Sequence, residues 1–485
     1  MYDLIISNVN IVRPLLEGTQ KMDIAILNGK IAEVKPDIDQ STAHKVFDGK
    51  NLLAFPGLVD AHMHTGIYNP LAEDALTESR AAAQGGVTTS LNYMRTGKYY
   101  LNKTGPYSSF FPEVLDISKG KFHVDYAYHI APIQQAHIDE IEMLIEKFGV
   151  TSFKIFMFYG SYGLHGNSNA QQDFLMTPAG EYYDFAHFEF IMRGIKKAME
   201  RFPEKANTIN LGLHCETAEI MRAYTHLVQK EGKLNGLKAY SAARPPHSEG
   251  LAIFIASYLA NETDCVNINL LHLTSAKAVD AAMMMQTVFP HINFKREVTL
   301  AHLILDYDCE CGLHAKVNPP IRSRADVEYL WEHVIRGNID WVCSDHACCK
   351  AEFKTDVHEQ QNVWLAKSGF GGTEFLLSGL YTEGTKRGLS VNKIAQLLSW
   401  NPAQRFGLKR KGDIAPGYDA DIVLADPAAT FVVKSANSYS TQGYSVFEGM
   451  TFSAPVCSTF LRGELIYHNG EVSSNPTGQY LFRPY

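Results

Sequence analysis

The 485-residue sequence lacks the features that mark several common classes of protein. It contains no run of about 18 apolar residues, so no segment is expected to span a membrane. Its first residues include neither a basic stretch nor a long apolar one, so no signal peptide is expected. Lys and Arg number 44 against 52 Asp and Glu, and the net charge of −8 argues against the basic surface of a nucleic-acid-binding protein. Internal repeats and low-complexity tracts are missing. We expect a cytoplasmic globular protein without nucleic-acid or membrane partners.

Cysteine, by contrast, is not scarce, since the chain contains eight. In a chain of this length without a secretory signal, these cysteines are expected to be reduced thiols. Cys309-Glu310-Cys311 and Cys348-Cys349 could in principle bind zinc through four thiolates, but their spacing is wrong for a zinc ribbon. We favour buried small thiols in a reducing compartment. The remaining cysteines are Cys215, Cys265, Cys343 and Cys457.

Both ends of the chain are predicted to consist of short strands and turns. Asn28-Gly29 is a strong hairpin signal between two apolar runs. The same texture of turn followed by strand returns near the C-terminus. The expected strands lie at 3–6, 23–27, 31–34, 417–424 and 460–467. We therefore predict a small β-sandwich domain formed by residues 1–55 together with 410–485.

The middle of the chain alternates between short apolar runs and helix-like segments. Such alternation over more than 300 residues is typical of parallel βα units. Its length favours a closed (β/α)8 barrel of the TIM type over an open sheet, covering residues 56–409. The apolar runs lie at 52–62, 151–158, 209–214, 266–273 and 338–345, and helix-like segments at 138–148, 185–201 and 327–336.

Several of these apolar runs end in a residue that can bind a metal. His62 and His64 are two positions apart on an extended chain, so both imidazoles point the same way. His214, His272 and Asp345 follow three other runs. In a parallel barrel, these strand ends meet at one face, where the active site lies. Four histidines and an aspartate suit a divalent metal, with zinc a natural occupant.

Lys154 lies inside an apolar strand, at residues 152–158. It could simply extend from a strand edge into solvent. Alternatively, burial would depress the pKa of its amine and leave it neutral and nucleophilic. Such an amine can add CO2 to form a carbamate, and a carbamate can bridge two cations. Lys154 is therefore a candidate metal ligand in N6-carboxylated form.

The ordered set of metal-binding candidates resembles that of a known family. It is similar to the binuclear amidohydrolases of the dihydropyrimidinase, hydantoinase, allantoinase and dihydroorotase group, over nearly the whole chain. Lesser motifs that also resemble this group are Arg244-Pro245-Pro246 with Glu249, and the segments 318–322, 344–346, 411–414 and 417–423. The resemblance implies a metal-dependent hydrolase that opens a C–N bond of a small cyclic amide or imide. It also implies a homodimer or homotetramer, since relatives often assemble in this way.

The resemblance further implies a role for each site residue. His62 and His64 hold one divalent ion with help from Asp345, and His214 and His272 hold the other. Carboxylated Lys154 and a hydroxide bridge the two ions, for which zinc is expected, and the hydroxide attacks the amide carbonyl. Asp345 takes the hydroxide proton and passes it to the leaving nitrogen. Tyr159 matches the tyrosine that donates to the developing oxyanion in hydantoinases.

The sequence indicates the group more clearly than it indicates which enzyme of the group this chain resembles most. Residues 154–159 are similar to hydantoinases and dihydropyrimidinases, and Thr65-Gly66 stands where dihydroorotases and allantoinases tend to have an arginine. Asn318 and His302, however, resemble those relatives, and Arg95 could replace the missing arginine. Tyr159, Asn318 and Arg95 are the predicted substrate contacts. We favour a hydantoinase or dihydropyrimidinase, with an allantoinase or dihydroorotase as the alternative.

A third possibility is a non-catalytic scaffold, as in collapsin-response-mediator-like relatives that have lost metal ligands. All six ligand positions are filled here, which disfavours it. Two segments remain open in function. The segment 161–180 is either a lid over the site or a tolerated insertion. The aromatic residues of 93–111 either line a substrate pocket or pack the barrel rim.

Overall fold

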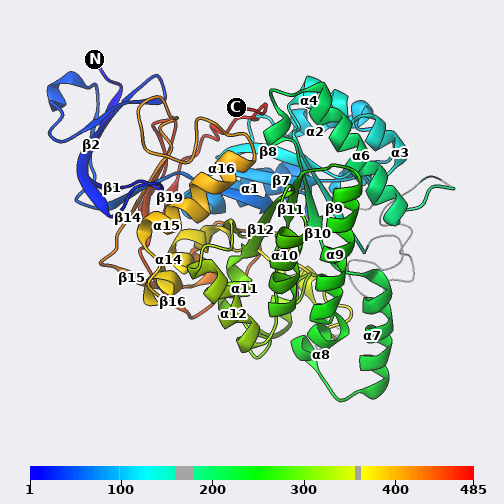
Figure 1. Ribbon diagram of the computed structural model, residues 1–485. Coiled ribbons are helices and arrows are strands. Elements are labelled where there is room, and N and C mark those ends of the chain that lie inside the picture. Colours follow the sequence, from blue (N-terminus) through cyan, green and yellow to red (C-terminus); the bar gives the residue numbers. More distant parts are fainter. Residues whose placement is uncertain (98, 159–177, 179, 356–361) are drawn as a thin grey trace.

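Two sheets of different kinds make up the structure (Figure 1), a computed structural model that describes residues 1–97, 99–158, 178, 180–355 and 362–485. Eight parallel strands, β6 to β13, lie in chain order and form a barrel. Nine further strands, from the two ends of the chain, form a separate sheet. The predicted fold class, a (β/α)8 barrel with a small β domain made from both termini, is confirmed. The predicted lid falls almost wholly outside the described residues.

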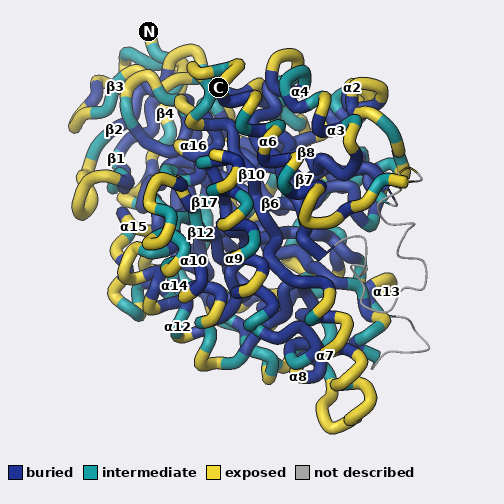
Figure 2. The backbone as a smooth tube through the Cα atoms, turned by 45° about the vertical axis from the view of Figure 1, so that its right-hand side comes forward, coloured by how far each residue is buried: buried dark blue, intermediate teal, exposed yellow. Residues whose placement is uncertain are grey.

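The barrel strands are short and almost entirely buried, as the dark blue centre of Figure 2 shows. Strands that are covered on both sides need apolar residues throughout, which explains the continuous apolar runs in the sequence. The first and last strands meet where the His64 N–H donates to the His346 carbonyl at 2.7 Å. The strands are β6 (Leu58–Met63), β7 (Val87–Met94), β8 (Asp125–Ile130), β9 (Ser152–Phe156), β10 (Asn210–His214), β11 (Asn267–Leu270), β12 (Asn293–Thr299) and β13 (Trp341–Cys343).

Helices follow the strands and cover the outside of the barrel (Figure 1). Asp184, Ser275 and Ser323 begin three of them by accepting a backbone N–H of the first turn. None of the described helices is long and apolar enough to cross a bilayer. The helices are α1 (Leu71–Gln84), α2 (Tyr107–Ser118), α3 (Gln135–Asp139), α4 (Ile141–Phe148), α6 (Phe185–Arg201), α7 (Ala218–Glu231), α8 (Gly236–Ala243), α9 (Pro246–Glu262), α10 (Ala276–Val288), α11 (Leu300–Ile304), α12 (Arg324–Ile335), α13 (Ala351–Lys354), α14 (Leu376–Lys386), α15 (Val391–Ala395) and α16 (Asn401–Arg405).

The small sheet joins the two ends of the chain through one strand pair, β5 with β14. The predicted hairpin at Asn28-Gly29 connects β2 to β3, and both residues have positive φ, as a tight two-residue turn requires. The strands are β1 (Leu4–Val12), β2 (Thr19–Leu27), β3 (Lys30–Lys35), β4 (Val46–Asp48), β5 (Leu53–Pro56), β14 (Ile422–Ala425), β17 (Val456–Leu461), β18 (Glu464–His468) and β19 (Glu471–Val472). β15 (Thr430–Val432) and β16 (Thr451–Ser453) pair separately.

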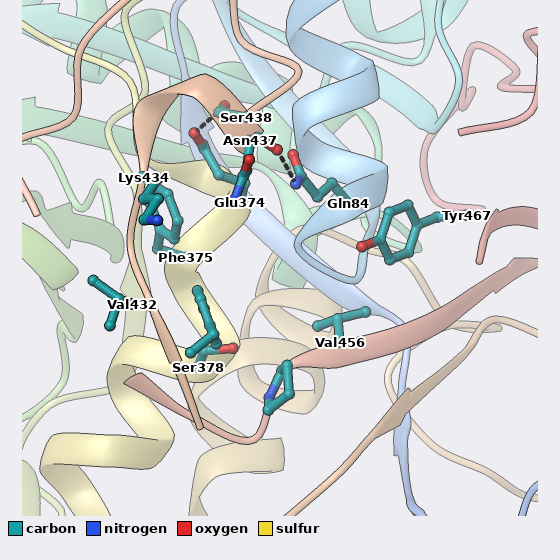
Figure 3. Close-up of a pocket in the computed structure, with 12 residues that line it drawn as sticks. Gln84, Glu374, Phe375, Ser378, Val432, Lys434, Asn437, Ser438, Val456 and Tyr467 are labelled. Carbon is teal, nitrogen blue, oxygen red and sulfur yellow. Dashed lines mark hydrogen bonds between the residues drawn. The ribbon is translucent and has the colours of Figure 1, made fainter. Parts of the chain in front are cut away.

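A polar-rimmed cavity lies where the small sheet meets the barrel helices (Figure 3). Gln84, at the end of α1, donates to the Asn437 carbonyl at 2.8 Å. Ser438 donates to the Glu374 carboxylate at 2.6 Å. These bonds connect the segment after β15 to the barrel. The last residues of the chain also contact the barrel, because Gly478 and Leu481 donate to backbone carbonyls at Phe122 and Tyr126. The division into 1–55 with 410–485 and 56–409 stays a prediction.

The aromatic residues of the segment 93–111 mainly pack the barrel rim. Tyr93, Tyr107, Phe110 and Phe111 are buried in the main hydrophobic core. The Tyr107 hydroxyl donates to the Ala131 carbonyl at 2.8 Å. Of the two alternatives for this stretch, packing therefore accounts for these four side chains.

A buried ion cluster ties the small domain to the barrel. The Lys411 ammonium lies 2.6 Å from Asp421, 2.8 Å from Asp125 of β8 and 3.4 Å from Asp419. Arg462 pairs with the same Asp125. Burial opposes the charge on Lys411, but the surrounding carboxylates outweigh it and raise the pKa of this lysine. This cluster gives a structural reason for the lysine in the segment 411–414.

Replacing Lys411 should therefore destabilise the fold without touching the barrel face that carries the histidines. Lys411→Met leaves buried carboxylates unpaired, and the free energy of unfolding should fall by about 3–5 kcal/mol. Denaturant titration measures this loss. The matched control is Lys409→Met, an exposed lysine two residues away, which should stay within about 0.5 kcal/mol of the parent. Equal stability of the two variants would contradict the role of the cluster.

Candidate metal centre

Three predicted ligands, from the first and last strands of the barrel, lie close together. His62 lies near the end of β6, His64 follows that strand directly, and Asp345 follows β13. Asp345 Oδ1 lies 2.9 Å from His62 Nε2 and 3.2 Å from His64 Nε2. Their three ligand atoms all lie within 4.8 Å of one another. These contacts arise because β6 and β13 are neighbours where the barrel closes, although they lie far apart in the sequence.

The Lys154 amine lies beside the same two imidazoles. Nζ contacts His62 Nε2 and lies 3.2 Å from His64 Nε2. The rings of Tyr93 and Phe156 are each 4.6 Å away from it. Burial lowers the pKa of Lys154 to about 8, in spite of the opposing effect of Asp345. The alternative of a lysine reaching into solvent from a strand edge is wrong, because this side chain is 2% exposed.

His214 and His272 form a second pair of candidate ligands. His214 ends β10 and His272 follows β11, and their ring centroids are 4.4 Å apart. The His272 ring is also 5.4 Å from that of His62, so the two sets adjoin. Burial lowers the pKa of His214 to about 4 and that of His272 well below its usual value. Both imidazoles are therefore neutral at physiological pH, the form that binds metals.

Unused polar atoms in these two sets fit a metal. His214 Nδ1 and His272 Nδ1 are buried and have no hydrogen-bond partner among the described residues. Asp345 Oδ1 lies close to two imidazoles but is aligned for a hydrogen bond with neither. Buried polar atoms normally have partners, so a cluster of three without one needs an explanation. Nitrogen and oxygen ligands of this kind suit a divalent transition metal.

Buried carboxylates outside the ligand sets hold the imidazoles in place. Glu297 of β12 accepts from His62 Nδ1 at 2.8 Å, the His272 N–H at 3.1 Å and Trp341 Nε1 at 2.7 Å. Burial works against a charged imidazole, but Asp345 and Glu297 raise the pKa of His62 to about 9. A metal on His62 would displace that proton. Fixing the second ring nitrogen in this way orients a ligand and strengthens its binding.

Three outer residues were missed by the sequence reasoning. Glu297 is an acidic residue inside a barrel strand, and this position could have marked it as a candidate for the site. Tyr100 lies 2.6 Å from His64 Nδ1 through its hydroxyl. Glu216 accepts from His214 Nε2 at 2.7 Å. Nothing in the local sequence marks Tyr100 among the many aromatic residues around it.

Comparison with known proteins agrees with this geometry. The amidohydrolase family profile matches residues 211–466. Allantoinases of Salmonella choleraesuis (strain SC-B67) and Salmonella newport (strain SL254) are each 30% identical over 99% of this chain and 99% of the relative. The chain belongs to the amidohydrolase family. The prediction of a cyclic amidase of this family, a hydrolase acting on C–N bonds, is confirmed.

Solved structures of hydantoinases have the same fold as this amidohydrolase. A crystal structure of a D-hydantoinase has a TM-score of 0.85 at 24% identity, covering 100% of this chain and 99% of that chain. The L-hydantoinase (dihydropyrimidinase) from Arthrobacter aurescens has a TM-score of 0.85 at 25% identity, covering 99% of both chains. The barrel and the small β domain are therefore shared along the whole length.

The two arginine motifs of this amidohydrolase support the rim of the barrel. Arg244 binds Glu216 through two nitrogens, with Nε–Oε1 at 3.0 Å and Nη2–Oε2 at 2.5 Å. Burial disfavours the ionised form of Glu216, but Arg244 outweighs it and lowers the pKa to about 2. Arg322 pairs with Glu249 and also donates to the Arg244 carbonyl at 2.5 Å. Neither arginine is among the described residues that line the cavity at the metal centre.

That cavity has mainly apolar sides with a few polar groups. Ile67, Tyr68, Phe156 and Val317 line it beside the candidate ligands His64, Lys154, His272 and Asp345. Asn318 and Ser368 supply polar atoms, and the Asn318 side-chain oxygen accepts from the Tyr240 hydroxyl at 2.5 Å. Of the predicted substrate contacts, Asn318 thus borders the cavity.

The other two predicted contacts are placed differently. Arg95 is fully buried at the end of β7, donates to the Thr96 carbonyl at 2.8 Å and lies 5.4 Å from the Tyr100 ring. It is not among the described residues that line the cavity. Tyr159 lies outside the described residues, directly after the buried Phe158.

Two buried lysines hold the far side of the cavity. Lys354 donates to the carbonyls of Lys316 at 2.9 Å and Gly369 at 2.6 Å. Lys316 donates to the carbonyls of Trp364 and Ala366. Burial lowers the pKa of Lys354 to about 7 and that of Lys316 well below its usual value. Each ammonium or amine group thus binds two backbone carbonyls, which fixes this side of the cavity.

Proposed function

We propose that this amidohydrolase opens a neutral cyclic amide or imide of the hydantoin type at a ring C–N bond. The single observation that carries the substrate class is the character of the cavity. Among the described residues that line it, the side chains beyond the candidate ligands are apolar or neutral. A substrate carboxylate would prefer a bidentate arginine, but Arg244 and Arg322 are each held by a buried glutamate. A neutral ring needs no such partner.

The residues favour two divalent ions, and we propose zinc. His62, His64 and Asp345 would hold one ion, and His214 with His272 the other. Two ions supply Lewis acidity, which lowers the pKa of water and polarises a carbonyl oxygen. The buried imidazoles of this chain are held by Glu297, Glu216 and Tyr100, so they need little reorganisation to bind.

Carboxylated Lys154 completes the proposed site. The second set has only two imidazoles, and zinc usually takes four ligands. The neutral Lys154 amine can form an N–C bond to CO2 and lose one proton, which converts it to an anionic carbamate. The amine stands beside His62 and His64, and the His62 ring adjoins that of His272, so a carbamate there would lie between the two sets.

Asp345 is the proposed proton carrier. Burial raises the pKa of a carboxyl group, but the adjacent His62 and His64 hold the pKa of Asp345 well below its usual range. It is therefore ionised and able to accept a proton at neutral pH. Because it borders the cavity, it can return that proton to the leaving ring nitrogen. Tyr159 stays a proposed donor to the ring oxygen, and Asn318 a proposed hydrogen-bond partner of the ring.

Allantoin is the second candidate substrate. The relatives at 30% identity over 99% of the chain are named allantoinases, whereas the hydantoinase structures are 24–25% identical. Allantoin is itself a hydantoin ring with a neutral ureido group, so the same apolar and neutral cavity is compatible with it. A cytoplasmic location is also proposed, since all eight cysteines are free thiols, as in reducing compartments.

We also propose assembly with further copies of the chain, as a homodimer or homotetramer. Helix α9 is apolar on both sides: it buries Ala252 and Ile253 against the barrel and exposes Phe254 and Tyr258. Helices α6, α9 and α10 are neighbours on the outside of the barrel (Figure 1). Phe185 of α6 and neighbouring residues of α10 form one apolar patch with Phe254 and Tyr258. Exposed apolar patches commonly mark interfaces.

Light scattering tests the assembly directly. The parent protein at micromolar concentration should show the mass of two or four chains. Tyr258→Glu introduces a charge into the patch and should shift the mass towards a single chain, while the exposed Lys147→Glu on α4 should not. A parent protein with the mass of one chain would contradict the proposal.

The carbamate is tested by Lys154→Ala. Without the shared anionic ligand, metal affinity should fall by at least about 100-fold, which exceeds the usual loss when a hydrogen-bond partner of a metal ligand is replaced. Turnover should fall to background. Short carboxylates such as acetate should partly restore activity by filling the gap. Lys147→Ala is the matched control. Full metal content and normal turnover in Lys154→Ala would rule the carbamate out.

The substrate class is tested by comparing kcat/KM for a C5-substituted hydantoin, allantoin, dihydrouracil and dihydroorotate. The protein is loaded with metal of measured content, and chelator-treated protein serves as the control. The best neutral ring should exceed dihydroorotate by at least about tenfold, or about 1.4 kcal/mol of barrier. A tenfold preference for dihydroorotate would overturn the neutral-ring proposal. The ratio of allantoin to substituted hydantoin then decides between the two candidates.

A further inference from the structure

Two cysteine thiols lie against each other far from the candidate metal ligands in sequence. Cys309 and Cys311 are both free thiols, and their Sγ atoms are 2.7 Å apart. Both side chains are half-buried, whereas most of the other cysteines are fully buried. The hydrolysis chemistry uses neither of them.

The pair is accessible from solvent. Cys309 and Cys311 line a groove of about 870 Å³ between the segment after α11 and the loop that precedes β16. His314 and Tyr444, whose rings stack at 4.2 Å, form part of the same groove. A small polar oxidant can therefore reach both sulfur atoms.

The pKa values of the two thiols are shifted in opposite directions. The two sulfur atoms share one hydrogen bond, and the pKa of Cys309 is lowered, chiefly by this bond and also by the backbone amides of Cys311 and Gly312, although burial opposes it. The pKa of Cys311 is raised, chiefly by the neighbouring Cys309 and then by burial. A thiolate is the reactive form of cysteine, and a second thiol in contact can resolve its first oxidation product.

We propose that Cys309 and Cys311 form a reversible dithiol–disulfide site that reacts with peroxides. The Cys309 thiol loses its proton to solvent, and the thiolate attacks one oxygen of hydrogen peroxide. The O–O bond breaks, Cys309 becomes a sulfenic acid, and the leaving hydroxide takes a proton from solvent to form one water. The Cys311 thiol then attacks that sulfur, the S–S bond forms, the S–O bond breaks, and a second water leaves. Two thiols are oxidised by two electrons and one peroxide is reduced to two waters.

The spacing of the two residues indicates a switchable bond and not a structural one. A disulfide between positions i and i+2 closes a very short loop, so it removes little entropy from the unfolded chain. Exposed or strained disulfides are also the more easily reduced ones. The sulfur atoms need only a short approach to reach the disulfide length of about 2.05 Å.

The site is connected to the candidate metal centre by a short stretch of chain. Cys311 precedes the 3-10 helix η4 (Gly312–Ala315), which leads directly into Val317 and Asn318. Those two residues line the cavity at the metal centre. The oxidation chemistry itself does not depend on the proposed substrate, so the two proposals can fail separately.

The test uses the reduced, metal-loaded full chain treated with hydrogen peroxide. Remaining thiols are blocked with N-ethylmaleimide, and the tryptic peptide that carries both cysteines is weighed. We expect this peptide to carry no N-ethylmaleimide and to be lighter by two hydrogen atoms than the unlabelled reduced peptide. Dithiothreitol should restore the mass of the reduced peptide. The pair should be oxidised roughly tenfold faster than Cys457, the other half-buried thiol. Cys457→Ser is the matched control and should behave as the parent.

Two variants test the order of events. In Cys311→Ser, Cys309 should stop at the sulfenic acid, which dimedone traps. In Cys309→Ser, Cys311 should remain a thiol under the same treatment. The proposal is wrong if the parent peptide keeps two thiols while Cys457 is oxidised. It is also wrong if dimedone labels Cys311 in the Cys309→Ser variant as readily as it labels Cys309 in the Cys311→Ser variant.

Discussion

The burial of the Lys154 amine against the imidazoles of His62 and His64 is the constraint on which the rest of the site depends. An ammonium group at 2% exposure, next to two histidines, is expensive, and its pKa falls towards neutrality as a result. The charge must be removed or compensated. Asp345 compensates part of it, and carboxylation would convert the amine into an anion that attracts cations. The same burial that makes a lysine unfavourable here thus makes a metal site favourable.

Buried carboxylates surround the candidate ligands and are themselves paired. Glu297 connects His62, the backbone of His272 and Trp341, so three strands share one acceptor. Glu216 connects His214 to Arg244, and Arg322 connects Glu249 to the Arg244 carbonyl. Each charge is buried with a partner, and breaking one pair would leave the other group uncompensated. The arginines are used for this purpose, which leaves a cavity with apolar and neutral sides.

The rim segments that complete the cavity have their own supports. Lys316 and Lys354 hold the segment that carries Ser368 and Gly369 by donating to backbone carbonyls. On the opposite end of the barrel, Lys411 and Asp125 attach the small domain to β8. Charged side chains thus act at both ends of the barrel, where strand ends leave polar groups that the apolar core cannot satisfy.

Sequence patterns alone determined a large part of this protein. The apolar runs predicted the barrel. Because the ends of parallel strands meet at one face, the runs also predicted that the residues at their ends lie close together, namely His62, His64, His214, His272 and Asp345. The hairpin at Asn28-Gly29 was predictable for the same local reason, the backbone preference of two residues.

Only the tertiary structure decided the partners of these residues. Glu297 lies 235 positions from His62, and Lys411 lies 286 positions from Asp125. Tyr100 is one of several aromatic residues in its segment, and nothing local distinguishes it as the one that contacts His64. The burial of Arg95 away from the cavity also depends on how the segment after β7 folds back on the core. Local patterns specify which face a side chain takes, but contacts between distant segments depend on barrel closure, which no short stretch of sequence encodes.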